Sequence, residues 1–152
     1  ADAAVAQSEA EREAFWAIRN DVRRIGDFWS PLKSYDVSVP VVQTVGYVDE
    51  LRAALRERWA DARLLVFGHV ADNNLHVIVT VGPDTHAHGN AIEALVYAGV
   101  RERQGSISAE HGIGLDKRAA MHATVAPPAL ALMRQLKALL DPQGLLNPGK
   151  VV

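Results

Sequence analysis

Apolar residues recur every three or four positions in four parts of the chain, a pattern that predicts amphipathic helices. The first stripe ends near Gly26. The last opens at Pro127-Pro128 and stops at Asp141-Pro142, because proline suits the first turn of a helix and not its interior. We expect the leucine and tryptophan positions of these stripes to belong to the core. The stripes are Phe15, Ile18, Val22 and Ile25; Val48, Leu51, Leu55 and Trp59; Ile92, Leu95, Val96 and Gly99; and Leu132, Leu136 and Leu139.

Shorter apolar segments between these helices predict β-strands. The first strand segment alternates in polarity and stops at Pro40, and two others flank Asp72-Asn73. Residues 28–31 are expected to form a loop. The strand segments are residues 35–39, 64–67, 75–81 and 106–108. The order β-α-β-β-α-β predicts an α+β fold, a ferredoxin-like split βαβ antiparallel sheet covered by helices, with extra N- and C-terminal helices. Residues 1–152 are expected to form one domain.

Composition narrows the class of protein. The 152 residues carry a formal net charge of -2, which gives no reason to expect nucleic acid or an anionic membrane as a partner. The lack of cysteine excludes a disulfide scaffold and thiolate ligands and fits a reducing compartment, so a cytoplasmic or organelle-matrix location is expected. No apolar run approaches the roughly 20 residues of a membrane span, and no signal-peptide pattern opens the chain. Because the sequence starts at Ala1 without methionine, we expect a piece of a longer protein.

Two histidines flank the expected hairpin turn. If the chain folds back between Asp72 and Asn73, His69 faces His76 across antiparallel strands, with Cβ atoms roughly 5 Å apart. Asparagine and aspartate tolerate such tight turns. In one straight strand the two histidines would point to opposite faces, because their offset is odd. The hairpin therefore predicts a pair of imidazoles that can share one divalent ion.

A second segment adds a carboxylate and a further imidazole. Glu110-His111 follows the short segment at residues 106–108 and precedes two closely spaced glycines. A carboxylate beside two imidazoles suits zinc or another first-row divalent ion, with one position left open for substrate. His111 then remains free as a general base. The candidate metal ligands are thus His69, His76 and Glu110, and the candidate catalytic residue is His111.

The other histidines and two basic side chains are expected to be structural or solvent-exposed rather than functional. A histidine beside a strand is more often a surface or core residue than a ligand. His86 and His88 follow a Gly-Pro-Asp turn and are expected in a solvated loop, and His122 is expected to be structural or exposed. Lys117 and Arg118 are expected to be solvated charges.

Four motifs follow one another along the chain. They are Phe-Trp-Ala-Ile-Arg at residues 15–19, Lys-Ser-Tyr-Asp-Val-Ser-Val-Pro at 33–40, the two histidine segments at 68–76 and 110–114, and residues 140–150. In this order they resemble the C-terminal domain of the FAD-linked oxidases that act on D-2-hydroxy acids, the group with D-lactate, D-2-hydroxyglutarate and glycolate dehydrogenases. The resemblance implies that an N-terminal domain binds FAD, while this domain caps the flavin and supplies much of the substrate pocket. The isolated chain is then expected to be inactive.

The resemblance also assigns roles to residues. The three candidate ligands fall on the family's metal ligands, and His111 falls on its catalytic base. Arg19 matches the arginine that binds the substrate carboxylate, which a guanidinium can hold by two parallel bonds. Asn147 and Lys150 lie in the segment that returns to the flavin domain, and they are expected to contact the cofactor side.

Several positions depart from the family pattern. The usual Gly-Asp-Gly-Asn is Ala-Asp-Asn-Asn at residues 71–74. The lysine that hydroxyglutarate-type enzymes place before Tyr-Asp is Ser34, their threonine one turn after the arginine is Arg23, and their asparagine after the second histidine is Ile78. These changes weaken an assignment to 2-hydroxyglutarate and leave the side-chain specificity open.

Two other functions stay open. A stand-alone metal-dependent hydrolase would use a metal-bound water, with Glu110 as both ligand and base. A catalytically silent binding or dimerisation module is the other alternative. The sequence does not reveal which 2-hydroxy acid is used, which electron acceptor follows FAD, whether the protein is a homodimer, or whether the metal is zinc, manganese, iron or cobalt.

Overall fold

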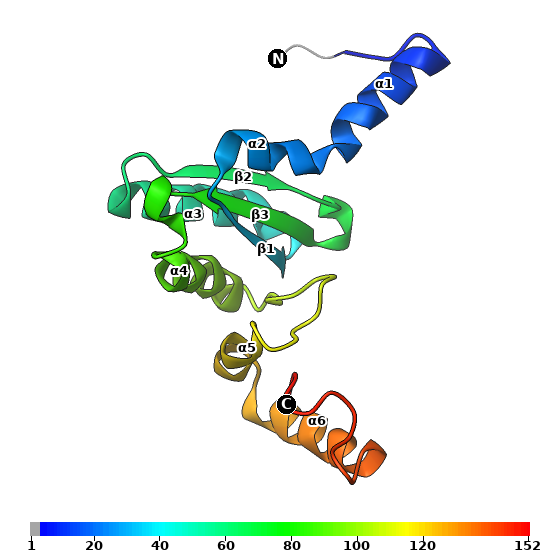
Figure 1. Cartoon of the computed structure of the whole chain (residues 1–152), viewed down its shortest axis with the longest axis vertical. Coiled ribbons are helices and arrows are strands. Elements are labelled where there is room, and N and C mark those ends of the chain that lie inside the picture. Colours follow the sequence, from blue (N-terminus) through cyan, green and yellow to red (C-terminus); the bar gives the residue numbers. More distant parts are fainter. Residues whose placement is uncertain (1–3) are drawn as a thin grey trace.

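A computed structural model describes residues 4–152 and has the predicted α+β fold (Figure 1). Its antiparallel sheet has the strand order β1-β3-β2. The strands are β1 (Lys33–Ser38), β2 (Arg63–Phe67) and β3 (Asn74–Thr80). The strand predicted at residues 106–108 is wrong, since Ser106 pairs with Ser38 only as a single bridge. The reason is local, because Ser106 Oγ bonds to the N–H and the carbonyl of Ser108 and closes a turn.

Two helices cover one face of the sheet, and the sequence predicts both. α3 (Thr44–Arg58) follows β1, and α4 (Gly89–Glu102) follows β3. Between them and the sheet lies the hydrophobic core. The strands contribute Tyr35, Val37, Leu75, Val77 and Val79, and the helices contribute Tyr47, Leu51, Leu55, Ile92, Val96 and Val100. Short 3-10 turns in the connections are η2 (Val41–Gln43), η3 (Val70–Asp72) and η4 (Pro83–Thr85).

The N-terminal helix is shorter than its apolar stripe predicts. α1 (Glu9–Asn20) starts after the N-cap Ser8 and ends at Asp21, which leaves the helical region at φ −86 and ψ 48. η1 (Val22–Arg24) and α2 (Ile25–Trp29) then continue in a new direction (Figure 1). The single helix through Gly26 is therefore wrong. The predicted loop at residues 28–31 is wrong for Phe28 and Trp29, which end α2, and confirmed for Ser30 and Pro31. The break falls at Asn-Asp, whose side chains compete with the helical backbone for hydrogen bonds.

α5 (Arg118–Thr124) and α6 (Pro127–Leu140) follow the core, and α6 begins and ends as its prolines predict. Leu132, Leu136 and Leu139 are 55%, 49% and 76% exposed. The prediction that this stripe belongs to the core is wrong, because α6 extends beyond the helices that cover the sheet (Figure 1). Trp59, the tryptophan of the second stripe, packs against the hydrophobic core as predicted. Within residues 4–152, no helix combines the length and hydrophobicity needed to span a bilayer.

Candidate metal and substrate site

The sheet face turned away from α3 and α4 carries two rows of side chains. Residues two apart on a strand share a face, and the cross-strand register aligns them across all three strands. The first row is Asp36, His76 and Phe67, and the second is Ser34, Ile78 and Leu65. α2 lies on this side of the sheet and α4 on the other (Figure 1). The two rows therefore lie outside the core and are available to form a site.

His69 does not face His76 across the hairpin. The residue opposite His76 is Phe67, so the predicted register is wrong. The connection is longer than a two-residue turn because it contains η3, and Asn73 then takes the left-handed conformation at φ 59. His69 consequently lies beyond the end of β2, in the connection itself.

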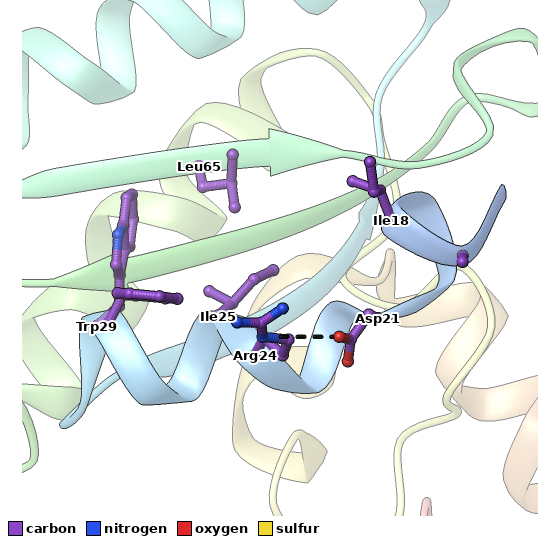
Figure 2. Close-up of a pocket in the computed structure, with 8 residues that line it drawn as sticks. Ile18, Asp21, Arg24, Ile25, Trp29 and Leu65 are labelled. Carbon is purple, nitrogen blue, oxygen red and sulfur yellow. Dashed lines mark ion pairs between the residues drawn. The ribbon is translucent and has the colours of Figure 1, made fainter. Parts of the chain in front are cut away.

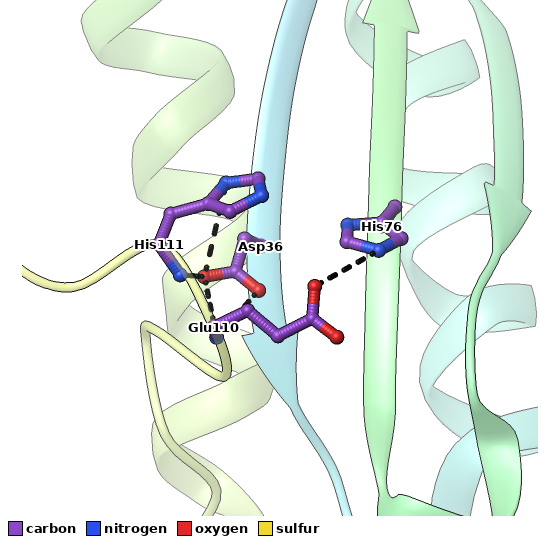
Figure 3. A group of neighbouring side chains, drawn as sticks. All are labelled: Asp36, His76, Glu110 and His111. Carbon is purple, nitrogen blue, oxygen red and sulfur yellow. Dashed lines mark hydrogen bonds and ion pairs between the residues drawn. The ribbon is translucent and has the colours of Figure 1, made fainter. Parts of the chain in front are cut away.

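Both histidines nevertheless reach Glu110. His69 Nδ1 lies 3.5 Å from Oε1. His76 Nε2 lies 3.6 Å from Oε2, a contact that Figure 3 shows. Two ligands of a tetrahedral ion, each roughly 2.1 Å from it, are about 3.4 Å apart. Each observed separation therefore matches two ligands of one ion, although the two histidines approach different oxygens of Glu110. Two imidazoles and a carboxylate also form a donor set that suits first-row divalent metals.

His111 stacks on His76. The two ring centroids are 5.6 Å apart with an interplanar angle of 23°, and His111 Nδ1 lies 4.0 Å from Asp36 Oδ2 (Figure 3). One donor atom from each of Asp36, His76, Glu110 and His111 lies within 4.8 Å of the others. Geometry thus offers a second ligand set, in which Asp36 and His111 replace His69. Within residues 4–152, His69 belongs to no group of three or more donors that are mutually this close.

Asp36 is a weak member of that second set, because its carboxylate already holds the backbone of the neighbouring loop. Its side chain is 1% exposed. Burial alone would raise the pKa of Asp36, but the hydrogen bonds it accepts and the nearby Lys117 charge outweigh burial and hold the pKa well below its usual range. The donors are the N–H groups of Ala109 at 3.1 Å, Glu110 at 3.0 Å and His111 at 2.9 Å, and Ser108 Oγ at 2.9 Å. Asp36 therefore fixes the position of Glu110 and His111.

Lys117 is not solvated, contrary to the expectation from sequence. Its ammonium lies 3.4 Å from Asp36 Oδ2 and donates to the Asp36 carbonyl at 3.2 Å and the Ile107 carbonyl at 3.1 Å. A buried carboxylate requires such a counter-charge. Arg118 is not free either, because it donates to the Gly149 carbonyl at 3.0 Å. Lys117 and Asp36 are thus functional supports that the sequence pattern does not reveal.

A pocket of about 560 Å³ lies between the two rows and the turn formed by η1 and α2. His76, Glu110 and His111 line it together with Arg23 from η1. A second hollow, of about 590 Å³, lies under the other side of α2 and is apolar apart from the Asp21–Arg24 ion pair (Figure 2). The candidate metal ligands His76 and Glu110 line the first pocket, whereas His69 does not, so the first pocket is the candidate site.

The remaining predicted site residues lie outside this pocket in the described part of the chain. Arg19 is exposed on α1, where its guanidinium lies 6.0 Å from the Trp16 ring centroid and donates to Asn20 Oδ1 at 3.2 Å. Asn147 and Lys150 are exposed on the C-terminal segment. That segment is held beside the His111 loop, because the N–H of Val151 donates to the Gly114 carbonyl at 3.0 Å.

Comparison with known proteins adds to this geometry. A family model described as FAD linked oxidases, C-terminal domain, matches residues 1–151. The D-2-hydroxyglutarate dehydrogenase of Stutzerimonas stutzeri (strain A1501) is 32% identical over 156 residues, which cover 99% of this chain and 33% of the relative. The mitochondrial D-2-hydroxyglutarate dehydrogenases of Rattus norvegicus and Danio rerio are 36% and 37% identical, over 99% of this chain and 28% of each relative. The chain thus spans about a third of the length of the relatives it matches.

Proposed function

The chain belongs to the family of C-terminal domains of FAD-linked oxidases, and from this membership we propose that it forms the substrate- and metal-binding part of a flavin-dependent dehydrogenase. The reaction is the oxidation of a D-2-hydroxy acid to the 2-oxo acid. The observation that carries the proposal is the position of Glu110 between His69 and His76, with His111 stacked beside them. In this proposal, the hydroxyl of a hydroxy acid in the pocket lies beside the metal-binding side chains and beside the His111 imidazole, which binds no metal.

His69, His76 and Glu110 would hold the metal. A divalent ion at these donors supplies Lewis-acid chemistry, which lowers the pKa of a bound hydroxyl. Asn74 Nδ2 donates to Glu110 Oε1 at 2.5 Å and orients the carboxylate, as outer-shell partners of metal ligands do. Since each oxygen of Glu110 is directed at a histidine, Glu110 is a poor base, and the hydrolase alternative has less support.

His111 is the proposed general base. Its Nδ1 lies toward Asp36, which leaves Nε2 for the substrate hydroxyl. The imidazole accepts the hydroxyl proton while the C2–H bond gives up a hydride, so that C2 and its oxygen become the carbonyl of the product. When bound, FAD supplies the hydride acceptor.

The flavin would be held mainly by an FAD-binding domain outside this chain, because the relatives are about three times as long. We propose that Asn147 and Lys150 contact that domain or its cofactor, since both are exposed on the segment bound to the His111 loop. The role of Arg19 in binding the substrate carboxylate stays a prediction.

The test is anaerobic flavin reduction in the complete flavoprotein that contains this domain, with matched D- and L-2-hydroxy acids. We expect a D-2-hydroxy acid to reduce the flavin, and His111→Gln to retain FAD while slowing reduction by about 100-fold or more. His86→Gln, in the exposed turn before α4, is the matched control. Normal reduction in His111→Gln would contradict the base. Full turnover after a chelator has removed all metal, checked by elemental analysis, would contradict the metal.

A further inference from the structure

The pocket that contains His76 and Glu110 has a single arginine or lysine among its described lining residues, namely Arg23. We infer that Arg23, rather than Arg19 as the resemblance predicts, binds the substrate carboxylate, and that the pocket takes a D-2-hydroxy acid with one carboxylate and an apolar side chain. This inference rests on the proposed function, since it names the acid that the same site oxidises.

Three arginines lie near the break after α1, and their surroundings differ. Arg24 Nε lies 3.7 Å from Asp21 Oδ2 and lines the other hollow (Figure 2). Arg19 is directed at Asn20 on exposed α1. Arg23 lines the site pocket and, within residues 4–152, forms neither an ion pair nor a side-chain hydrogen bond. An unpaired guanidinium in a pocket can hold a carboxylate by two parallel bonds.

The register of the sheet indicates where the rest of the substrate lies. Ser34 and Ile78 are neighbours in the second row, two residues along the strands from Asp36 and His76, which is a distance of about 7 Å. Phe67 and His76 from the first row and Ser34 and Ile78 from the second line the same pocket. A ligand whose hydroxyl meets His76 and Glu110 therefore has room to extend its chain over Ile78.

The surface over which that chain extends is mainly apolar. Methylene groups gain free energy on such a surface, whereas a carboxylate without a partner loses its hydration at a large cost. Arg23 can balance one carboxylate, and a second one finds no further lysine or arginine among the described lining residues. The apolar lining side chains are Val22, Ile25, Leu32, Phe67 and Ile78.

The experiment uses two acids of equal chain length, D-2-hydroxypentanoate and D-2-hydroxyglutarate, with the complete flavoprotein. They differ only in a terminal methyl or carboxylate. We expect kcat/KM to be at least about tenfold higher for D-2-hydroxypentanoate. Arg23→Ala should raise its KM about 10- to 100-fold with a smaller change in kcat, and Arg23→Lys should restore part of the loss.

Binding provides a readout that does not depend on flavin chemistry. In calorimetric titration, 2-oxopentanoate should bind the unaltered protein and lose about 10-fold or more in affinity in Arg23→Ala. Arg24→Ala is the matched control, because Arg24 lies next to Arg23 but lines the other hollow. Circular dichroism checks that each variant is folded, and the exposed position of Arg23 favours this.

Three outcomes would overturn the inference. They are a preference for D-2-hydroxyglutarate, an Arg23→Ala effect within about twofold of the control, or a larger KM effect of Arg19→Ala than of Arg23→Ala. Failure of the proposed function looks different, because then none of the D-2-hydroxy acids reduces the flavin. Arg23-dependent binding of 2-oxopentanoate would in that case still support Arg23 as the carboxylate site.

Discussion

Replacing Asp36 with asparagine removes the charge that holds the segment carrying Glu110 and His111. The carboxylate accepts three backbone N–H groups and a hydroxyl and pairs with the Lys117 ammonium. An amide of the same size keeps one oxygen and turns N–H groups toward these donors. Removing one member of a buried charge pair costs about 3–5 kcal/mol, and we expect Asp36→Asn to lower the free energy of unfolding by that amount. The melting temperature should fall by roughly 6–20 °C.

The assay is urea unfolding followed by tryptophan fluorescence, repeated over a pH series. Because the folded-state pKa of Asp36 lies below its ordinary value, its contribution to stability is complete above the ordinary carboxyl pKa of about 4. The contribution declines as the pH falls through that value toward the folded-state pKa. The stability difference between the unaltered protein and Asp36→Asn should therefore shrink on acidification.

Lys117→Met completes a double-mutant cycle with Asp36→Asn. The two residues are in contact, so their effects should be less than additive. Arg12→Ala removes the exposed Arg12–Glu9 pair on α1 and should cost less than about 1 kcal/mol. A loss below about 1 kcal/mol in Asp36→Asn, or strict additivity with Lys117→Met, would refute the reasoning.

Three further predictions concern the metal donors, their support and the core. His69→Ala and His76→Ala should each weaken zinc binding about 10-fold or more, measured by competition with a chromophoric chelator. The control His86→Ala should leave zinc affinity unchanged. Unchanged affinity in His69→Ala would favour the ligand set with Asp36 and His111. Asn74→Asp places a like charge beside Glu110 Oε1. It should lower the free energy of unfolding, measured by urea denaturation, by about 1–3 kcal/mol. An unchanged urea midpoint would exclude the Asn74–Glu110 hydrogen bond. Ile92→Ala empties a fully buried core position and should cost about 2–5 kcal/mol in thermal unfolding; a smaller loss would contradict its placement in the core.

Elements with local signals are predictable from sequence. α6 begins at its proline pair and ends before Asp141 as expected, and the stripes of α3 and α4 mark their buried faces. Periodicity does not show how many residues a connection takes, so the hairpin register is wrong once η3 lengthens the turn. Periodicity also does not show whether another helix or sheet packs on an apolar stripe. For this reason the exposure of the α6 leucines could not be predicted from the sequence.

The site shows the same division. Residue type and order are enough to place His69 and His76 each near Glu110, although the hairpin geometry that motivated the pairing is wrong. The contact between Asp36 and Lys117 joins residues 81 positions apart and leaves no periodic trace. The end of α1 at Asp21 likewise determines which arginine lines the pocket. The apolar stripe continues past Asp21, so the sequence pattern does not show that the helix ends there.

The alternation along β3 separates two structural roles. Val77 and Val79 pack against the helices, whereas Ile78 is buried but lies outside that hydrophobic core cluster. Substitutions at Ile78 or Ser34 can therefore reshape the pocket while the helix-packed layer and the metal donors stay intact. Directed evolution confined to this one face should yield variants with new acid preferences at little loss of thermostability.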